Sequence, residues 1–106
     1  MTDAPSPKAL KKAADDRIAL YDALLSLRTR EEVDAFLSDL CTPSELRAFA
    51  ERWAVARLLD EQAQTYREIA LAAGASPTTV VRVARSLKDM PHQGYRLVLD
   101  RLKKKA

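Results

Sequence analysis

The side chains that could recognise a ligand concentrate in the second half of the chain, between residues 66 and 88. A threonine hydroxyl can hydrogen-bond to a nucleic-acid base, and a threonine methyl group can touch the methyl group of thymine. Arginine and lysine bind phosphates, which gives affinity and register but little sequence choice. The residues that we expect to take these roles are Arg67, Thr78, Thr79, Arg82 and Lys88. Their chemistry is the noncovalent recognition of double-stranded DNA.

Two short helices joined by a tight turn must position these residues. A Thr-x-x-Glu capping box over 65–68 predicts a helix over 66–73. Gly74 can adopt the positive φ that a tight turn needs. Ser76, followed by a proline, then predicts the start of a second helix that runs to about residue 88.

The second of these helices has one apolar face. Val80, Val83 and Leu87 recur at helical spacing, so we expect them to face the core. The remaining faces then carry polar side chains, namely Thr78, Thr79, Arg82 and Ser86. This arrangement is typical of a helix-turn-helix motif, in which the second helix enters the major groove of DNA. We therefore predict such a motif over about 66–88.

The distribution of charge is compatible with two kinds of partner. Residues 1–64 hold 9 basic and 12 acidic residues, whereas residues 65–106 hold 9 basic and 3 acidic ones. Four cations surround the predicted helix pair, namely Arg67, Arg82, Arg85 and Lys88. A basic surface of this kind favours DNA as the partner. The alternative is a helical interaction module whose basic corner docks an acidic protein, and such a module would show no preference among duplexes.

The rest of the chain is also helical in pattern. Apolar residues recur at intervals of three and four over about 16–27, 30–40, 43–60 and 95–103, and no alternating strand pattern occurs. Together with the two helices above, these segments predict an all-α fold of six helices. We expect residues 1–14 to be a flexible segment and residues 15–106 to form one helical domain.

Composition excludes several classes of protein. One cysteine, Cys41, and one histidine, His92, can form neither an internal disulfide nor a zinc site within one chain. No nucleophile–base pair or phosphate-binding loop is present, so we expect neither an enzyme nor a cofactor. No apolar run approaches the roughly 20 residues that span a membrane, and the N-terminal segment lacks the apolar stretch of a secretory signal. We therefore expect a soluble, cytoplasmic protein with no membrane partner.

Several blocks of residues along the chain form a pattern that extends beyond the helix pair. The blocks are Leu40–Glu45, Arg52, Leu58-Leu59, Thr65–Ile69, Gly74–Ser76, Thr79–Arg82, Ser86–Lys88 and Gly94–Leu102. Over about residues 20–103 this pattern resembles the tryptophan repressor superfamily, and within it the YerC/YecD-type repressor-related proteins. The resemblance implies an intertwined homodimer. It also implies a transcriptional regulator, specifically a repressor, in which the second helix of each helix-turn-helix enters one of two successive major grooves. It also places Arg67, Thr78, Thr79, Arg82 and Lys88 where the family contacts DNA.

The resemblance further implies a pocket for a small-molecule effector. In the tryptophan repressor the amino acid lies between two arginines, beside a threonine, a glycine and a serine. The matching residues here are Thr42, Arg52, Arg82, Val83 and Ser86. Because Val83 replaces the glycine, its branched side chain takes space that the indole needs, and overpacking costs about 1–3 kcal/mol. We expect tryptophan not to be the effector. We expect Arg52 and Arg82 to pair with acidic neighbours; the alternative is that they hold another carboxylate ligand.

Overall fold

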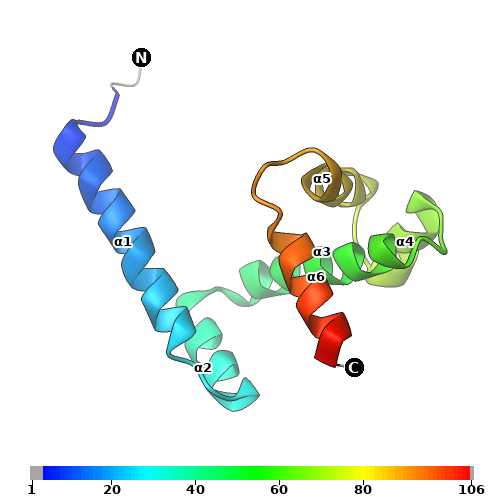
Figure 1. Cartoon of the computed structure of the whole chain (residues 1–106), viewed down its shortest axis with the longest axis horizontal. Coiled ribbons are helices and arrows are strands. Elements are labelled where there is room, and N and C mark those ends of the chain that lie inside the picture. The colour runs from blue at the N-terminus through cyan, green and yellow to red at the C-terminus, as the bar shows by residue number, and fades with distance from the viewer. Residues whose placement is uncertain (1–3, 106) are drawn as a thin grey trace. The chain divides into compact units, whose positions relative to one another are not determined.

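The protein is built from helices. A computed structural model describes residues 4–105, and within that range it contains six helices and no strand (Figure 1). The helices are α1 (Pro7–Leu25), α2 (Arg30–Leu40), α3 (Pro43–Glu61), α4 (Tyr66–Ala73), α5 (Pro77–Lys88) and α6 (Gly94–Lys105). The all-α, six-helix prediction is therefore confirmed. The chain divides into two compact units, Met1–Cys41 and Thr42–Ala106, and the single domain predicted over 15–106 stays a prediction.

In the first unit, α1 begins earlier than the sequence predicted. Ser6 caps the helix, and a proline occupies its first position. Two ion pairs join residues one turn apart, namely Lys11 Nζ to Asp15 Oδ2 at 2.9 Å and Lys12 Nζ to Asp16 Oδ2 at 2.7 Å. Such pairs stabilise the first turns of the helix, which precede its regularly spaced apolar residues. The helix thus begins at Pro7, whereas the sequence predicted a start near residue 16. The flexibility predicted for residues 1–14 stays a prediction, and residues 1–3 lie outside the described range.

Both helices of the first unit keep many of their apolar side chains exposed. Neither α1 nor α2 contains a buried residue. The large apolar side chains that remain exposed are Leu10, Ile18, Tyr21, Leu24, Leu25, Val33 and Leu40. An exposed apolar stripe of this length is typical of a surface that another chain covers.

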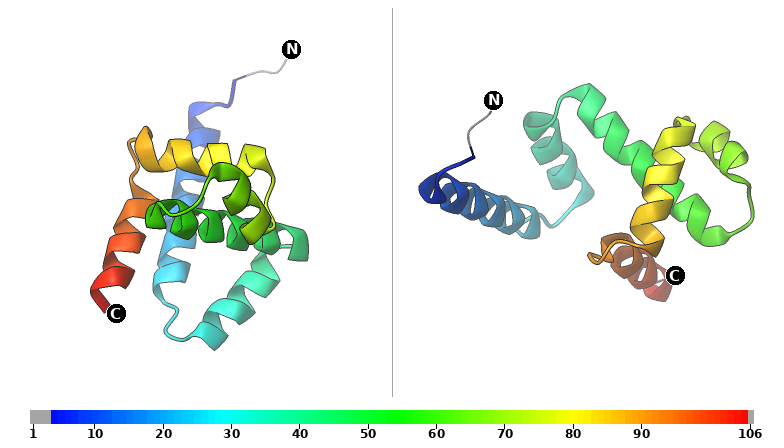
Figure 2. Two further views of the ribbon diagram at one scale, coloured as in Figure 1. Left: turned by 90° about the vertical axis from the view of Figure 1, so that its right-hand side faces the viewer. Right: turned by 90° about the horizontal axis from the view of Figure 1, so that it is seen from above.

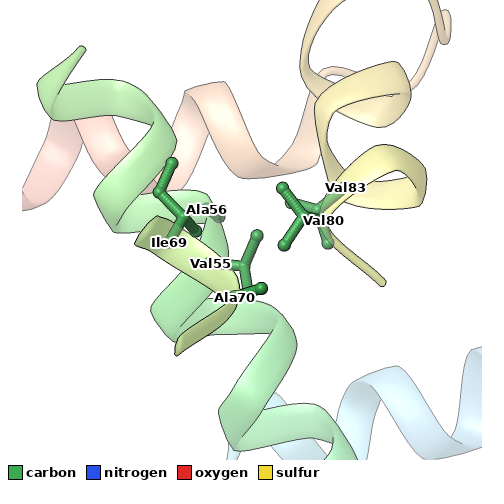
Figure 3. Close-up of a cluster of buried hydrophobic side chains, with 6 residues drawn as sticks. All are labelled: Val55, Ala56, Ile69, Ala70, Val80 and Val83. Atoms are coloured by element: carbon green, nitrogen blue, oxygen red, sulfur yellow. The ribbon is translucent and has the colours of Figure 1, made fainter. Parts of the chain in front are cut away.

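The second unit has a small, fully buried core between three consecutive helices. Its members are Val55, Ala56, Ile69, Ala70, Val80 and Val83. Figure 3 shows these six side chains gathered between α3, α4 and α5. Because half of them are valine and two are alanine, the helix axes can approach closely, and α5 crosses α3 (Figure 2). This packing fixes the orientation of the helix pair α4–α5 on α3.

Two ion pairs and one aromatic contact hold α6 on α3. The carboxylate of Asp60 accepts a hydrogen bond from Arg96 Nη1 at 2.8 Å and pairs with Lys103 Nζ at 2.6 Å. The ring of Tyr95 stacks on that of Trp53, with centroids 6.3 Å apart and planes 21° apart. The two ion pairs of Asp60 and the aromatic stack therefore join α6 to α3.

Replacing Asp60 with asparagine should lower the free energy of unfolding by about 1–2 kcal/mol at neutral pH. The side chain of Asp60 is only 10% exposed, but its two cationic partners are 39% and 61% exposed, which limits the loss. Hydrogen bonds from Lys103 and Arg96 hold the pKa of Asp60 below its ordinary value. The stabilisation is therefore complete above about pH 4 and is lost as the pH falls through the lowered pKa.

Urea unfolding at several pH values measures this effect. The matched control is Asp100→Asn, because Asp100 also contacts Arg96, at 3.3 Å, but is 53% exposed. We expect the control to change the free energy of unfolding little. Equal losses for the two variants would show that Asp60 has no special part in holding α6.

Candidate nucleic-acid interface

The turn between α4 and α5 is fixed by residues that act locally. Thr65 and Glu68 form a reciprocal capping box at the start of α4. Gly74 ends that helix with φ +66°, and the Ala75 amide donates to the Ala70 carbonyl at 3.0 Å. Ser76 then caps α5 by accepting from the Thr79 amide at 3.1 Å. These starts and ends agree with those that the sequence predicted.

Replacing Gly74 with alanine should lower the free energy of unfolding by about 1 kcal/mol. A Cβ at this position would meet nothing within 4 Å, so the cost comes from the left-handed backbone alone. Asparagine tolerates this conformation better, and Gly74→Asn should lose less. Urea unfolding measures the difference, with Gly94→Ala as control, because Gly94 has neither a positive φ nor a close neighbour. A loss as large for Gly94→Ala would contradict the explanation.

The predicted DNA-contacting residues all lie on this helix pair. Arg67 is exposed on α4, and Thr78, Arg82 and Lys88 are exposed on α5. Thr79 is half-buried, and its Oγ1 lies 3.0 Å from the Oγ of Ser76. The opposite face of α5 is buried through Val80, Val83 and Ala84. The outward face is therefore free to meet a partner.

The cations on this surface are available to bind phosphate. Within residues 4–105, the ion pairs include none of Arg67, Arg82, Arg85 and Lys88. Helix α5 itself carries no acidic residue. The carboxylate of Glu68 accepts a hydrogen bond from the Thr65 amide, which holds the pKa of Glu68 below its ordinary value. We call the exposed Arg67, Thr78, Arg82, Arg85 and Lys88, with the half-buried Thr79, the reading surface.

The residues of the implied effector pocket have other local roles. Thr42 caps α3 and accepts from the Glu45 amide at 3.1 Å. Val83 is 1% exposed and belongs to the buried core. Ser86 lines an apolar cavity of about 490 Å³ between α3, α5 and α6. The side chain of Val83 thus packs between α3, α4 and α5.

The predicted pairing of two arginines with acidic neighbours is wrong for the described chain. Within residues 4–105, neither Arg52 nor Arg82 takes part in an ion pair. Arg52 instead lies over the ring of Phe49, with its guanidinium carbon 5.8 Å from the ring centroid. Phe49 is three residues earlier on the same helix, a spacing that brings the two side chains within reach of each other. Arg82 has no acidic residue on its own helix to pair with.

Sequence reasoning missed the exposed apolar side chains beside the reading surface. Leu71 on α4 is 77% exposed, and Val81 on α5 is 52% exposed. They line a shallow cavity of about 510 Å³ on the outer side of the helix pair. An apolar residue in a helical pattern is ordinarily assigned to the core, which is why this exposure was missed. One signal in the sequence indicated it, because Val81 lies outside the face formed by Val80 and Val83.

Comparison with known proteins identifies the family of this chain. The sequence profile of the Trp repressor protein family matches residues 17–103. The chain belongs to this family. It is 42% identical over 84 residues to the uncharacterized protein YerC of Bacillus subtilis (strain 168), covering 79% of each chain. The resemblance seen in the sequence is therefore confirmed.

Two solved structures share the fold of this family member. A TrpR-like protein from Eubacterium eligens has a TM-score of 0.75 and 40% identity, covering 80% of this chain and 86% of that one. A candidate Trp repressor from Staphylococcus aureus has a TM-score of 0.77 and 38% identity, covering 94% and 96%. Among the described residues of this chain, no helix is long and apolar enough to cross a membrane.

Proposed function

We propose that this protein is a sequence-specific DNA-binding regulator of transcription, acting as a repressor. The observation that carries the proposal is the reading surface, on which exposed, unpaired cations border two threonines at the start of α5. Residues in the first turn of such a helix reach base edges, while the surrounding cations hold phosphates. Membership of the Trp repressor protein family supports the same reading. The proposal includes no catalytic step, and the cytoplasmic location stays a prediction.

An intertwined homodimer is the second part of the proposal. Besides the apolar stripe of α1 and α2, large apolar side chains are exposed on α3 and α6, namely Phe49, Leu97, Val98 and Leu102. A chain of 106 residues buries a limited fraction of its surface, so covering these side chains with a second copy would stabilise it. A symmetric dimer would also present two reading surfaces to one duplex.

Tryptophan is not the effector in this proposal. Val83 supports this view because its side chain is packed in the core at the position of the family's glycine. Making room for an indole there would require the removal of buried methyl groups or a shift of α5.

Selection of bound duplexes from a random library, at two salt concentrations, tests the function. We expect enrichment of a two-fold symmetric site, binding that weakens steeply with salt, and no change when tryptophan is added. Salt-sensitive binding without any enriched site, or binding only to acidic proteins, would contradict the proposal and favour an interaction module.

Replacing Thr79 with alanine should reduce the preference for the enriched site by about tenfold and leave nonspecific affinity nearly unchanged. The expected loss is specific because Thr79 lies in the first turn of α5, whereas phosphates supply the sequence-independent affinity. Titration with the selected and a scrambled duplex measures both quantities. An equal loss on the two duplexes would remove Thr79 from base reading.

A further inference from the structure

The outer side of the helix pair carries an apolar groove next to the reading surface. It is lined by Tyr66, Arg67, Ala70, Leu71, Ala75, Pro77 and Val81 and has a volume of about 510 Å³. Three of its side chains are large and substantially exposed, with exposed fractions of 42% for Tyr66, 77% for Leu71 and 52% for Val81. The lining residue Ala70 belongs to the buried core of the unit, whereas Tyr66, Leu71 and Val81 do not.

The groove is continuous with the cationic residues. Arg67 belongs to both the groove and the reading surface. On α5, Val81 is three residues from Thr78 and four from Arg85, so all three lie on neighbouring turns of one face. A partner that contacts the exposed cations therefore also meets the apolar side chains.

The positive charge beside the groove indicates which kind of partner binds there. Arg67, Arg82, Arg85 and Lys88 make no ion pair within the described range, and the carboxylate of Glu68 is taken up by the Thr65 amide. A polyanion complements such a surface. In the major groove of duplex DNA, the apolar group on the base edges is the C5-methyl of thymine. An apolar side chain among phosphate-binding cations is thus matched to thymine.

We propose that this groove reads thymine through its C5-methyl group, with Val81 as the principal contact and Leu71 at the border. The inference rests on the proposed DNA-binding function and adds the chemical feature of the base that is read. The hydroxyl of Thr79 supports it, because that hydroxyl already lies 3.0 Å from Ser76 Oγ, so part of its hydrogen-bonding capacity is used within the helix cap.

Selection from two parallel libraries tests the proposal, one with thymidine and one with deoxyuridine in its place. Uracil keeps the hydrogen-bonding groups of thymine and lacks only the methyl group. We expect a thymine-containing site to be enriched in the first library, and the same site with uracil to bind about threefold to fivefold more weakly for each methyl group removed. Replacing Val81 with alanine should reduce this difference.

Two variants separate methyl reading from general affinity. Val81→Ala shortens the apolar contact at a half-exposed position, so the fold should persist, and the thymine-to-uracil ratio should fall clearly toward one. Arg85→Ala is the matched control, because loss of a phosphate contact should weaken binding to both duplexes equally and keep the ratio. Thermal unfolding of both variants verifies that they remain folded.

The outcomes distinguish the inference from the function on which it rests. Equal binding of thymine and uracil duplexes by the unmodified protein, with sequence preference intact, overturns methyl reading and leaves the proposed function standing. A ratio that persists in Val81→Ala overturns the assignment of Val81. The absence of any enriched site in either library overturns the proposed function and the inference with it.

Discussion

Replacing Arg67, Arg82 and Lys88 together with alanine should weaken binding to duplex DNA by at least about a hundredfold at 0.1 M salt. All three side chains are exposed and make no ion pair within residues 4–105, so their charges are free to displace counterions from DNA. Each phosphate contact contributes about 0.9 to the slope of log affinity against log salt concentration. At 0.1 M salt, the loss of one such contact therefore weakens binding by up to about eightfold. A dimer would lose such contacts at two reading surfaces.

The matched control removes the same charge elsewhere. Lys8, Lys11 and Lys12 lie on α1, where Lys11 and Lys12 are already paired with aspartates. Their joint replacement by alanine should change the affinity only slightly, and titrations over a range of salt concentrations should give an almost unchanged slope. Comparable losses in the two triple variants would show that net charge, and not the reading surface, binds the DNA.

Replacing Ile69 with alanine should lower the free energy of unfolding by about 2–5 kcal/mol. Ile69 is 1% exposed and is among the largest fully buried side chains of the core between α3, α4 and α5. Truncation leaves a cavity among short valine and alanine side chains that cannot readily move to fill it. Because Ile69 lies on α4, the helix pair should also lose its fixed orientation, and DNA affinity should fall together with stability.

Urea unfolding of Ile69→Ala and Leu71→Ala measures this effect. The two positions lie two residues apart on α4, but Leu71 is 77% exposed. We expect Leu71→Ala to change the free energy of unfolding by less than about 0.5 kcal/mol. Similar losses at both positions would mean that exposure in the described structure does not determine which α4 residues stabilise the fold.

Helix boundaries could be predicted from the sequence where their signals are local. The starts of α3, α4 and α5 each follow a threonine or serine that caps the helix through an amide three residues later, and the structure has each of these bonds. The start of α1 was predicted too late because the apolar periodicity begins well inside the helix. The signal there was Ser6 followed by proline, supported by ion pairs between residues four apart.

Features that depend on contacts between distant residues could not be predicted in the same way. The bond between Asp60 and Arg96 joins residues 36 positions apart, and nothing in their local sequence selects the partner. The environment of Arg52 was predicted wrongly because charge pairing was expected, whereas its guanidinium lies over an aromatic ring on the same helix. The groove was missed because Leu71 and Val81 have the residue types of core positions, and only tertiary packing decides which apolar face is covered.

Helix α5 separates its two tasks by face, and this separation affects how the protein can evolve. Val80, Val83 and Ala84 anchor the helix in the core, whereas Thr78, Val81 and Arg85 are exposed. Exposed substitutions ordinarily change stability by less than about 0.5 kcal/mol. We therefore expect mutations on the outer face to alter the proposed DNA preference without a loss of folded protein. Duplicated copies of such a gene could diverge toward different operators while inheriting the same scaffold.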